Sequence, residues 1–539
     1  MSRQNCKTER GYVELVILKL SSSTCKCGPS PQTLVTFAMN KQFRAHPSFS
    51  STRTPSSSGT VVSHSSPPMA SALILSLVLI ILCSSYGGIA HTDAAAGHKG
   101  PKFVMVPTTS FQSSEDSCST SSGTTAPHSS RVSVPLAHRH GPCAPVPAKE
   151  EMTLAERLGR DRARTMSMTR RLSKSTRLQN NYDAITVPTQ LGSSYNTQEY
   201  VVTVGIGTPA VPQTLLLDTG SDLTWVQCKP CNSTNCYPQR LPIFDPSRSS
   251  SYATIPCDSQ ECRDLAAGLD GNGCTTNWDC AYQVVYGSKA NTSGVYSRDS
   301  LTIAPGAVIE DFRLGCGHNQ EGPFDEYDGI LGLGRLPESL AWQTTPDPER
   351  RGVFSHCLPP TGGTTGFLSL GPPENTSGFA FTPLLTMDDQ PWAYQLMLTG
   401  ISVGGEPLDI PAAVFREGMI TDSGTIVTAL QDTAYAALRA AFRRAMAGYP
   451  LAPPTAQLDT CYNLTGYEEV TVPTVSLTFR GGATVELDAE SGLMLDGCLA
   501  FWNTDGDEYT GVIGNVNQRT IEVLYDLPGA RVGFRTGAC

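Results

Sequence analysis

The spacing of apolar and polar residues divides the chain into parts with different textures. Residues 1–68 are rich in Ser, Thr and Pro and show no apolar period. The stretch from Ala72 to Cys83 is nearly all apolar, and its 12 residues are fewer than the roughly 20 that a helix needs to cross a bilayer. Small residues follow as far as Ala90. This pattern is typical of a cleaved secretory signal over residues 69–90, starting at Met69.

Two interpretations of residues 1–68 stay open. The segment has the composition of a plastid transit peptide, or it is an upstream extension of the reading frame that is not normally translated. Residues 91–185 begin with a similar composition and then become basic, with a helical pattern from Leu154 to about Leu178. This is either a solvated charged helix or an inhibitory prosegment. A cationic prosegment would dock over an acidic cleft and loosen when acid protonates the carboxylates.

From about Ile185 the pattern changes to short strands separated by Gly, Pro and Asn turns. Residues 200–204 alternate as a half-buried strand does, and Leu215–Leu217 and Ile330–Leu331 are short buried runs. The texture predicts a mainly β fold for residues 199–539.

One clear helix is expected at Asp432–Ala447. Asp432 can cap its first turn, Tyr435, Leu438 and Phe442 share one face, and Gly448 can end it.

The charge is distributed unevenly. The chain of 539 residues has a net charge of −10, but residues 186–539 alone carry 18 Lys and Arg against 39 Asp and Glu. Sequence-independent binding to nucleic acid needs a basic surface, so this acidic body argues against it.

Twelve of the 18 cysteines lie after residue 186. Cys228 and Cys231 have the spacing of a zinc half-site or a redox motif, but no matching second pair follows. Disulfides in an oxidising compartment fit better, and no metal or cofactor is expected. Four glycosylation sequons favour the same compartment. They are Asn232, Asn291, Asn375 and Asn463.

A duplicated motif carries the candidate chemistry. An apolar run leads into Asp218-Thr219-Gly220-Ser221, and a second one leads into Asp422-Ser423-Gly424-Thr425. Downstream of each copy lies an aliphatic pair closed by glycine, at residues 329–334 and 511–515. Each half of the body therefore has the order strand, Asp-hydroxyl-Gly-hydroxyl, long excursion, strand.

This arrangement suits a pair of carboxylates at the bottom of a cleft. The glycines allow a sharp turn, and the flanking hydroxyls can hold the carboxyl groups. Two such loops face to face would bring Asp218 and Asp422 within about 3 Å, where the pair shares one proton. The ionised member would activate a water molecule while the protonated member donates to a carbonyl.

With these motifs the chain resembles the pepsin-like aspartic proteases, and among them the plant nepenthesin-like group, from about Glu199 to Cys539. The resemblance implies a bilobal fold with an N-terminal lobe at 199–376, a Cys-rich insertion at 228–280 and a C-terminal lobe at 377–539. Asp218 and Asp422 would be the catalytic pair. Tyr286 and Gly287 would belong to a flap over the cleft, with Trp225 bonded to Tyr286.

The resemblance also implies a set of disulfide pairs. They are Cys228–Cys231, Cys236–Cys316, Cys257–Cys280, Cys262–Cys274, Cys357–Cys539 and Cys461–Cys498. Spacing alone does not choose among the pairings. The flap departs from the family pattern, because Tyr286-Gly287 continues with Ser288-Lys289-Ala290 in place of an Asp-Gly-Ser sequence.

The sequence therefore favours a monomeric acid endopeptidase that acts on protein or peptide substrates. It would be secreted as a zymogen to the extracellular space or the vacuole. A binding or inhibitor protein on the same fold is one alternative, although both aspartates are kept. The other is a plastid nucleoid-associated protease, since Val134–Cys143 looks like the prosegment of plant proteases of that description.

Overall fold

The computed structural model describes residues 2–8, 11–17, 103–107, 133–138, 153–170, 189–191 and 199–539. The last range lacks residues 232–233, 266–270, 346, 361–364, 387–390, 456 and 490. The expected signal segment and Asn232 lie outside the described residues. The chain divides into two units, residues 1–94 and 95–539. The first contains a hairpin of β1 (Ser2–Thr8) and β2 (Gly11–Ile17), which the composition of residues 1–68 did not predict.

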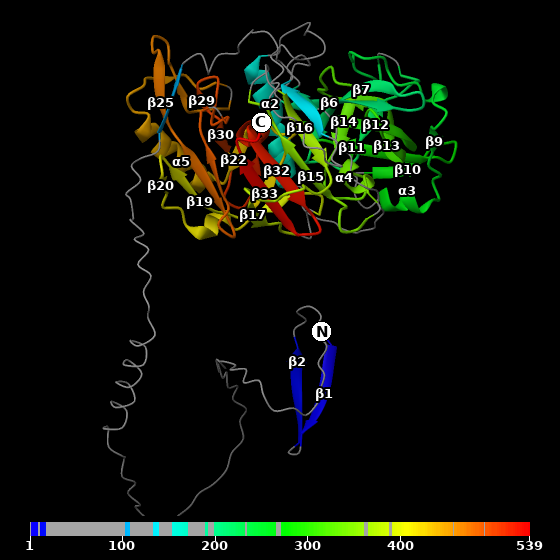
Figure 1. Ribbon diagram of the computed structural model, residues 1–539, viewed down its shortest axis with the longest axis horizontal. Helices are drawn as coiled ribbons and strands as arrows, with labels where there is room; N and C mark the ends of the chain where they lie inside the picture. Colours follow the sequence, from blue (N-terminus) through cyan, green and yellow to red (C-terminus); the bar gives the residue numbers. More distant parts are fainter. Residues whose placement is uncertain are drawn as a thin grey trace, which may run out of the picture. The chain divides into compact units, whose positions relative to one another are not determined.

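The second unit is built mainly of strands, with residues of its first half on one side and of its second half on the other (Figure 1). The predicted mainly β, two-lobed fold is confirmed. The largest sheet has 16 strands. In order they are β10 (Gly271–Cys274), β11 (Cys280–Val285), β12 (Asn291–Ala304), β13 (Ala307–Glu321), β8 (Trp225–Gln227), β14 (Gly329–Gly332), β7 (Val211–Asp218), β6 (Tyr200–Ile206), β4 (Ser133–His138), β16 (Thr365–Leu370), β15 (Val353–Cys357), β32 (Ile521–Asp526), β33 (Arg531–Thr536) and β17 (Ala380–Pro383), with β5 (Thr189–Leu191) on β6 and β9 (Ala253–Thr254) on β12.

Smaller sheets make up the rest of the C-terminal lobe. One contains β18 (Gln395–Leu396), β21 (Met419–Thr421), β31 (Gly511–Ile513), β22 (Thr428–Leu430) and β30 (Phe501–Asn503). The others contain β20 (Glu406–Pro407), β19 (Leu398–Val403), β26 (Val475–Phe479) and β27 (Thr484–Leu487); β23 (Leu451–Ala452), β24 (Cys461–Tyr462), β29 (Cys498–Leu499) and β28 (Met494–Leu495); and β25 (Glu469–Pro473) with β3 (Phe103–Pro107).

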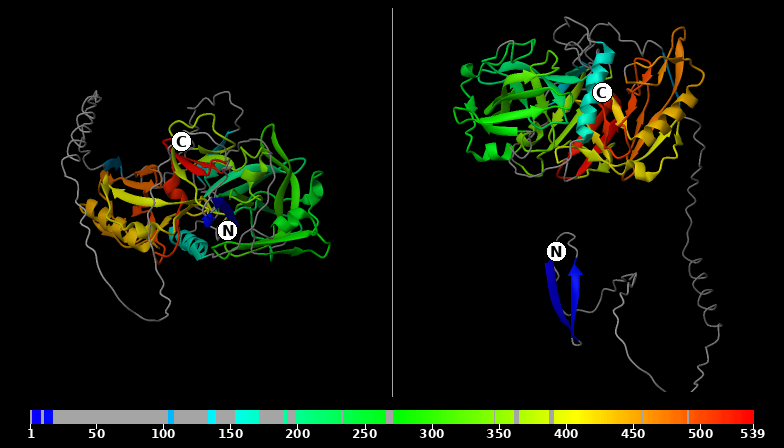
Figure 2. Two further views of the ribbon diagram at one scale, coloured as in Figure 1. Left: turned by 90° about the horizontal axis from the view of Figure 1, so that it is seen from below. Right: turned by 180° about the vertical axis from the view of Figure 1, so that it is seen from behind.

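Helices are short apart from two. They are α2 (Leu154–Arg170), α3 (Gln260–Leu265), α4 (Leu340–Gln343) and α5 (Asp432–Ala445), with 3-10 turns η3 (Pro246–Arg248), η4 (Ala412–Phe415) and η5 (Asn515–Gln518). Figure 2 shows α2 lying along the middle of the second unit. In the part of the chain that the structure describes, no helix is long and apolar enough to cross a membrane.

The duplicated motif folds as a duplicated strand arrangement. In the first half β7 lies parallel to β14, with Asp218 opposite Gly332. In the second half β21 lies parallel to β31, with Thr421 opposite Ile513. The strand that follows each Asp loop, β8 or β22, then pairs antiparallel with the same partner. Each aspartate therefore lies at, or directly after, the end of a buried strand whose position is fixed by its pairing with neighbouring strands.

The helix predicted at Asp432–Ala447 forms as α5, with Tyr435, Leu438 and Phe442 buried as expected. The expected cap is wrong. Gln431 occupies the N-cap position without a side-chain bond, and the Asp432 carboxylate instead accepts a hydrogen bond from Asn503 at 3.0 Å. The helix also ends before Gly448, with its C-cap at Met446.

Four of the expected disulfides are wrong, and two are as expected. The structure pairs Cys357 with Cys539 and Cys461 with Cys498. Cys228 does not bond to Cys231. It follows β8, which runs parallel to β13, so its side chain faces Cys316 on that strand and bonds to it. Cys231 bonds to Cys236 instead.

In the Cys-rich insertion the bonds are Cys257–Cys274 and Cys262–Cys280. Their burial explains the pairing, since Cys262 and Cys280 lie in the core whereas Cys274 is exposed. Cys262–Cys280 is therefore the inner bridge, and Cys257–Cys274 is the outer one. The sequence does not show which cysteines point inward, so it could not distinguish this pairing.

Asp328 and Glu338 are two of the carboxyl groups that are buried in the N-terminal lobe. Asp328 precedes β14 and accepts the backbone N–H of Thr214 at 2.6 Å. Burial raises its pKa from 3.8 to about 7. Burial likewise raises the pKa of Glu338 from 4.5 to about 7. Both groups are therefore protonated in the folded protein under acid conditions, where burial costs least.

This burial predicts a protein that is more stable in acid than at neutral pH. Between its pKa in the unfolded chain and its higher pKa in the folded protein, each of these carboxyl groups is protonated only in the folded protein. Its contribution to the free energy of unfolding is therefore complete below about pH 4 and is lost as pH rises towards 7. For Asp328 alone the loss is on the order of 4 kcal/mol. In D328N that part of the loss should vanish when chemical unfolding is compared at pH 4 and pH 7. Substitution of the exposed Asp258 by Asn is the matched control, and an unchanged slope in D328N would contradict the prediction.

Candidate functional site

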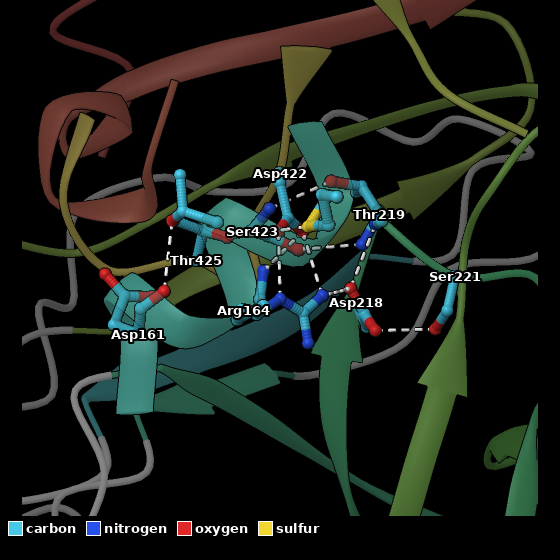
Figure 3. A network of polar contacts seen from close by, with 12 residues as sticks. Asp161, Arg164, Asp218, Thr219, Ser221, Asp422, Ser423 and Thr425 are labelled. Carbon is cyan, nitrogen blue, oxygen red and sulfur yellow. Dashed lines mark hydrogen bonds and ion pairs between the residues drawn. The ribbon is translucent and has the colours of Figure 1, made fainter. Parts of the chain in front are cut away.

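Asp218 and Asp422 are brought together in one network of polar contacts (Figure 3). Asp218 is the last residue of β7, and Asp422 follows directly after β21. Neither side chain has measurable exposure. The two loops approach so closely that a Cβ atom on Gly220 would lie 2.6 Å from Asp422 Oδ1, and one on Gly424 would lie 2.6 Å from Asp218 Oδ1. Glycine at these positions is thus required by the opposite carboxylate.

Each carboxylate is held by its own loop in the same way. Asp218 Oδ1 accepts the N–H of Gly220 at 2.9 Å, and its Oδ2 accepts the Ser221 hydroxyl at 2.5 Å. Asp422 accepts the N–H of Gly424 at 2.9 Å and the Thr425 hydroxyl at 2.5 Å. The expected supporting hydroxyls therefore orient the two carboxyl groups as a near-symmetric pair.

The two loops are also bonded to each other. The N–H of Thr219 donates to Ser423 Oγ at 3.0 Å, and the N–H of Ser423 donates to Thr219 Oγ1 at 2.9 Å. The Ser423 hydroxyl in turn donates to the carbonyl of Leu217 at 2.9 Å. All of these groups are buried, where an unmade hydrogen bond is costly, so the exchange fixes one loop against the other.

A basic side chain from the predicted prosegment occupies the space between the two carboxylates. Arg164 of α2 lies with Nη2 at 2.6 Å from Asp218 Oδ1 and at 3.3 Å from Asp422 Oδ1. Its Nε donates to Asp422 Oδ2 at 3.1 Å. Both inner carboxylate oxygens are within hydrogen-bonding distance of one nitrogen atom, and Figure 3 shows the guanidinium group between them.

This cation sets the charge state of the pair. Burial raises the pKa of Asp422, but Arg164 and the Thr425 hydroxyl outweigh burial and lower it overall. Burial raises the pKa of Asp218, and Arg164 offsets the increase only in part. Burial disfavours the charged form of Arg164, yet the two aspartates raise its pKa. One cation therefore neutralises part of the charge of a pair that could not otherwise both ionise.

Further contacts fix α2 in this position. The Asp161 carboxylate accepts the backbone N–H groups of Ile426 and Val427 at 2.7 and 2.9 Å, directly after the second Asp loop. Leu158 is fully buried in an apolar cluster that includes Val427. Met168 packs on a second cluster with Ile420. The helix thus binds through apolar contacts at both ends and through polar contacts in the middle.

The predicted flap covers α2 from the other side. Tyr286 follows β11, and its hydroxyl accepts a hydrogen bond from Trp225 Nε1 at 2.7 Å, the contact that the resemblance implied. A Cβ atom on Gly287 would collide with the Arg164 carbonyl oxygen, so the flap backbone rests on the helix backbone. A cavity of about 50 Å³ remains, lined by α2 and by aromatic residues that include Tyr286 and Phe324. It is too small for a peptide.

The remaining predicted positions lie on the surface. Lys289 is exposed at the flap tip with a φ of 68°, and Asn291 opens β12 beside it. Asn375 and Asn463 are exposed, and each accepts a backbone N–H two residues ahead.

The chain is similar to known proteins along most of its length. Family models described as xylanase inhibitor N-terminal and xylanase inhibitor C-terminal match residues 200–372 and 393–536. An aspartyl protease family protein of Arabidopsis thaliana is 36% identical over 471 residues, which cover 86% of this chain and 98% of that protein. The chain belongs to the pepsin-like aspartic protease family. Nepenthesin-2 of Nepenthes gracilis, another member, is 34% identical over 364 residues, covering 63% of this chain and 78% of its own.

Two solved structures share the fold. Basic 7S globulin from soybean matches with a TM-score of 0.53 at 19% identity, covering 66% of this chain and 94% of its own. A structure titled edgp matches with a TM-score of 0.51 at 18% identity, covering 67% and 96%.

Sequence reasoning did not identify Arg164 and Asp161. The basic pattern from Leu154 onward indicated a helix for an acidic cleft, but several arginines share that helix. The available signal was the spacing of an acid and a base three residues apart, which places both on one helix face.

Proposed function

We propose that the protein is an aspartic endopeptidase in which Asp218 and Asp422 activate a water molecule. The observation that carries the proposal is the symmetric support of two buried carboxylates around one shared position. That position is now filled by Arg164 Nη2, within hydrogen-bonding distance of both inner oxygens. A water molecule placed there would contact both carboxylates in the same way.

The chemistry follows from the shared proton. Without the arginine, two carboxylates this close hold one proton between them. The ionised carboxylate takes a proton from the water as its oxygen attacks the scissile carbonyl carbon, while the other donates its proton to the carbonyl oxygen. Collapse of the tetrahedral intermediate breaks the C–N bond, and the amine leaves with a proton. The flap with Tyr286 and Gly287 would close over an extended protein or peptide substrate.

We further propose that the protein is made as a zymogen, in which α2 blocks the site. Arg164 and the flap contact leave no room for a peptide, and the body's net negative charge suits a cationic blocker. This agrees with the expected prosegment at 91–185 and with lobes at 199–376 and 377–539. Secretion to the extracellular space or the vacuole would supply the oxidising compartment for the disulfides and an acid environment for activation.

Acid should release α2 through the aspartate pair. The bound arginine lowers the pKa of Asp422, so its contribution to docking is present at neutral pH and is lost as pH falls and the pair takes up a proton. Asp161 acts in the opposite direction, since burial raises its pKa. The acid response therefore depends on Arg164.

The first experiment tests catalysis. Purified precursor is brought to about pH 3–5, where carboxylates take up protons, and is followed for shortening near residue 185 and for digestion of a denatured protein. D218A should lower the rate at least about 100-fold, because the pair supplies the acid–base chemistry. Pepstatin should abolish digestion by the wild type. Digestion that neither change affects would refute the assignment, and a folded, processed but inactive protein would favour a binding or inhibitor function.

The second experiment tests the block. R164Q leaves two buried carboxylates without their cation, which costs docking about 3–5 kcal/mol. Labelled pepstatin at pH 7 should therefore bind uncut R164Q and not the uncut wild type. R162Q is the matched control, because Arg162 lies on the same helix but pairs with the half-exposed Asp505. Equal binding to both variants would show that Arg164 is not what closes the site.

A further inference from the structure

Two kinds of force hold α2, β3 and β4 on the rest of the second unit. The helix α2 is held by charged groups in its middle and by apolar contacts at both ends. Arg164 binds the aspartate pair, and Arg160 and Arg162 form ion pairs with Asp325 and Asp505 at 2.9 and 2.7 Å. Protonation of the aspartate pair weakens its contact with Arg164, whereas the buried Asp161 carboxylate acts in the opposite direction. The strands β3 and β4 are held by main-chain pairing, and backbone N–H and C=O groups do not titrate.

The strand β3 is the pairing partner of β25, a strand of the C-terminal lobe. Its residues pair antiparallel with β25 in an unbroken register from Phe103 opposite Pro473 to Pro107 opposite Glu469. Among the described strands β3 is the only partner of β25. Val470 and Val472 on β25 are buried. Loss of β3 would leave an open strand edge on a well-packed support, and such edges bind another strand readily.

The strand β4 lies inside the largest sheet. It pairs with β16 from Ser133 opposite Ser369 to Ala137 opposite Thr365. On the other side it pairs with β6 at Val201 and Tyr200. The order β6-β4-β16 makes β4 the connection between the N-terminal strands and the sheet that contains β15, β32 and β33. Its departure would expose the edge of β16, whereas Val201 and Tyr200 of β6 also pair with β5.

We propose that the segment carrying β3 and β4 stays bound to the body after the segment carrying α2 has been cut out, so that the active protein contains two non-covalently associated chains. The proposal rests on the proposed zymogen function. Two strands on one short segment, residues 103–138, reinforce each other, since release of one leaves the other in place to restore it.

Few titratable groups oppose the strands. β3 contains none, and Glu469 lies opposite its last residue, Pro107. On β4, His138 pairs with Tyr200, whose hydroxyl accepts a hydrogen bond from Arg519 at 3.1 Å. The strand β16, which faces β4, contains no ionisable residue. Acid therefore acts on α2 and leaves the strand pairing in place.

The test uses the full chain with recognition sequences for a specific protease substituted within residues 139–152 and within residues 171–188. Cutting at pH 7 yields an N-terminal piece with β3 and β4, a middle piece with α2, and the body. The sample is then divided between pH 7 and about pH 4, with pepstatin added on acidification to block digestion. Gel filtration and mass spectrometry identify which pieces elute with the body.

All three pieces should elute together at pH 7. At pH 4 the middle piece should leave while the N-terminal piece stays. Release of the N-terminal piece at pH 4, or retention of the middle piece, would overturn the proposal. If residues that follow the cut took the place of β4 in the sheet, the N-terminal piece would be released, and this outcome too would overturn the proposal. Because an added protease makes the cuts, the result does not depend on the protein's own activity, whose failure would appear separately as absence of digestion without pepstatin.

Two adjacent substitutions provide a matched pair. In a strand, successive N–H groups point to opposite edges, so only one of M105P and V106P removes a donor that faces β25. That variant should release the N-terminal piece roughly 10-fold faster, and the other should behave like the unsubstituted chain. Equal release rates in both variants and the unsubstituted chain would contradict a role for β3.

Discussion

The exchange of hydrogen bonds between Thr219 and Ser423 is the contact on which the site depends. Each loop supplies an N–H to the other's hydroxyl, so neither loop can move without leaving a buried donor or acceptor unsatisfied. The strands behind the loops, β7 with β14 and β21 with β31, carry this constraint into both lobes. The carboxylates therefore meet in a geometry that neither half of the chain can form alone.

The same closeness creates an electrostatic problem that α2 resolves. Two buried carboxylates at this separation repel each other unless a proton or a cation lies between them. Arg164 supplies the cation in a planar group that contacts both. Once α2 has left, a proton shared by the pair would take over the role of this cation. In the proposed zymogen the state of the site therefore depends on pH while the scaffold stays in place.

The sequence predicted what local pattern determines. The duplicated motif identified both loops, the strands before and after them, and the hydroxyls that hold the carboxylates, because these lie within a few residues of each aspartate. It also indicated a basic helix for an acidic cleft. It did not predict which arginine reaches the pair, since that depends on how α2 sits in the cleft, fixed by distant contacts such as Asp161 with Ile426.

Four of the six disulfide pairs were predicted wrongly for a related reason. Cys228 bonds to a cysteine 88 residues away because parallel strands bring it there, and in the insertion the inward direction of Cys262 and Cys280 decides the pairs. Sequence spacing contains neither kind of information. The start of α5 at Asp432 was predicted correctly and its end was misjudged by two residues, which is typical of helix boundaries. The cap residue differed because Asn503, from a distant strand, engages the Asp432 side chain.

The position of β4 between β6 and β16 has a consequence for biosynthesis. Because β4 precedes both neighbours in the chain, it leaves the ribosome before either of them and is available when each arrives. β16 follows more than two hundred residues later, and pairing of that kind is slow when the ends must find each other unaided. The segment that we propose stays bound after processing is therefore also part of the template on which the two lobes are first joined.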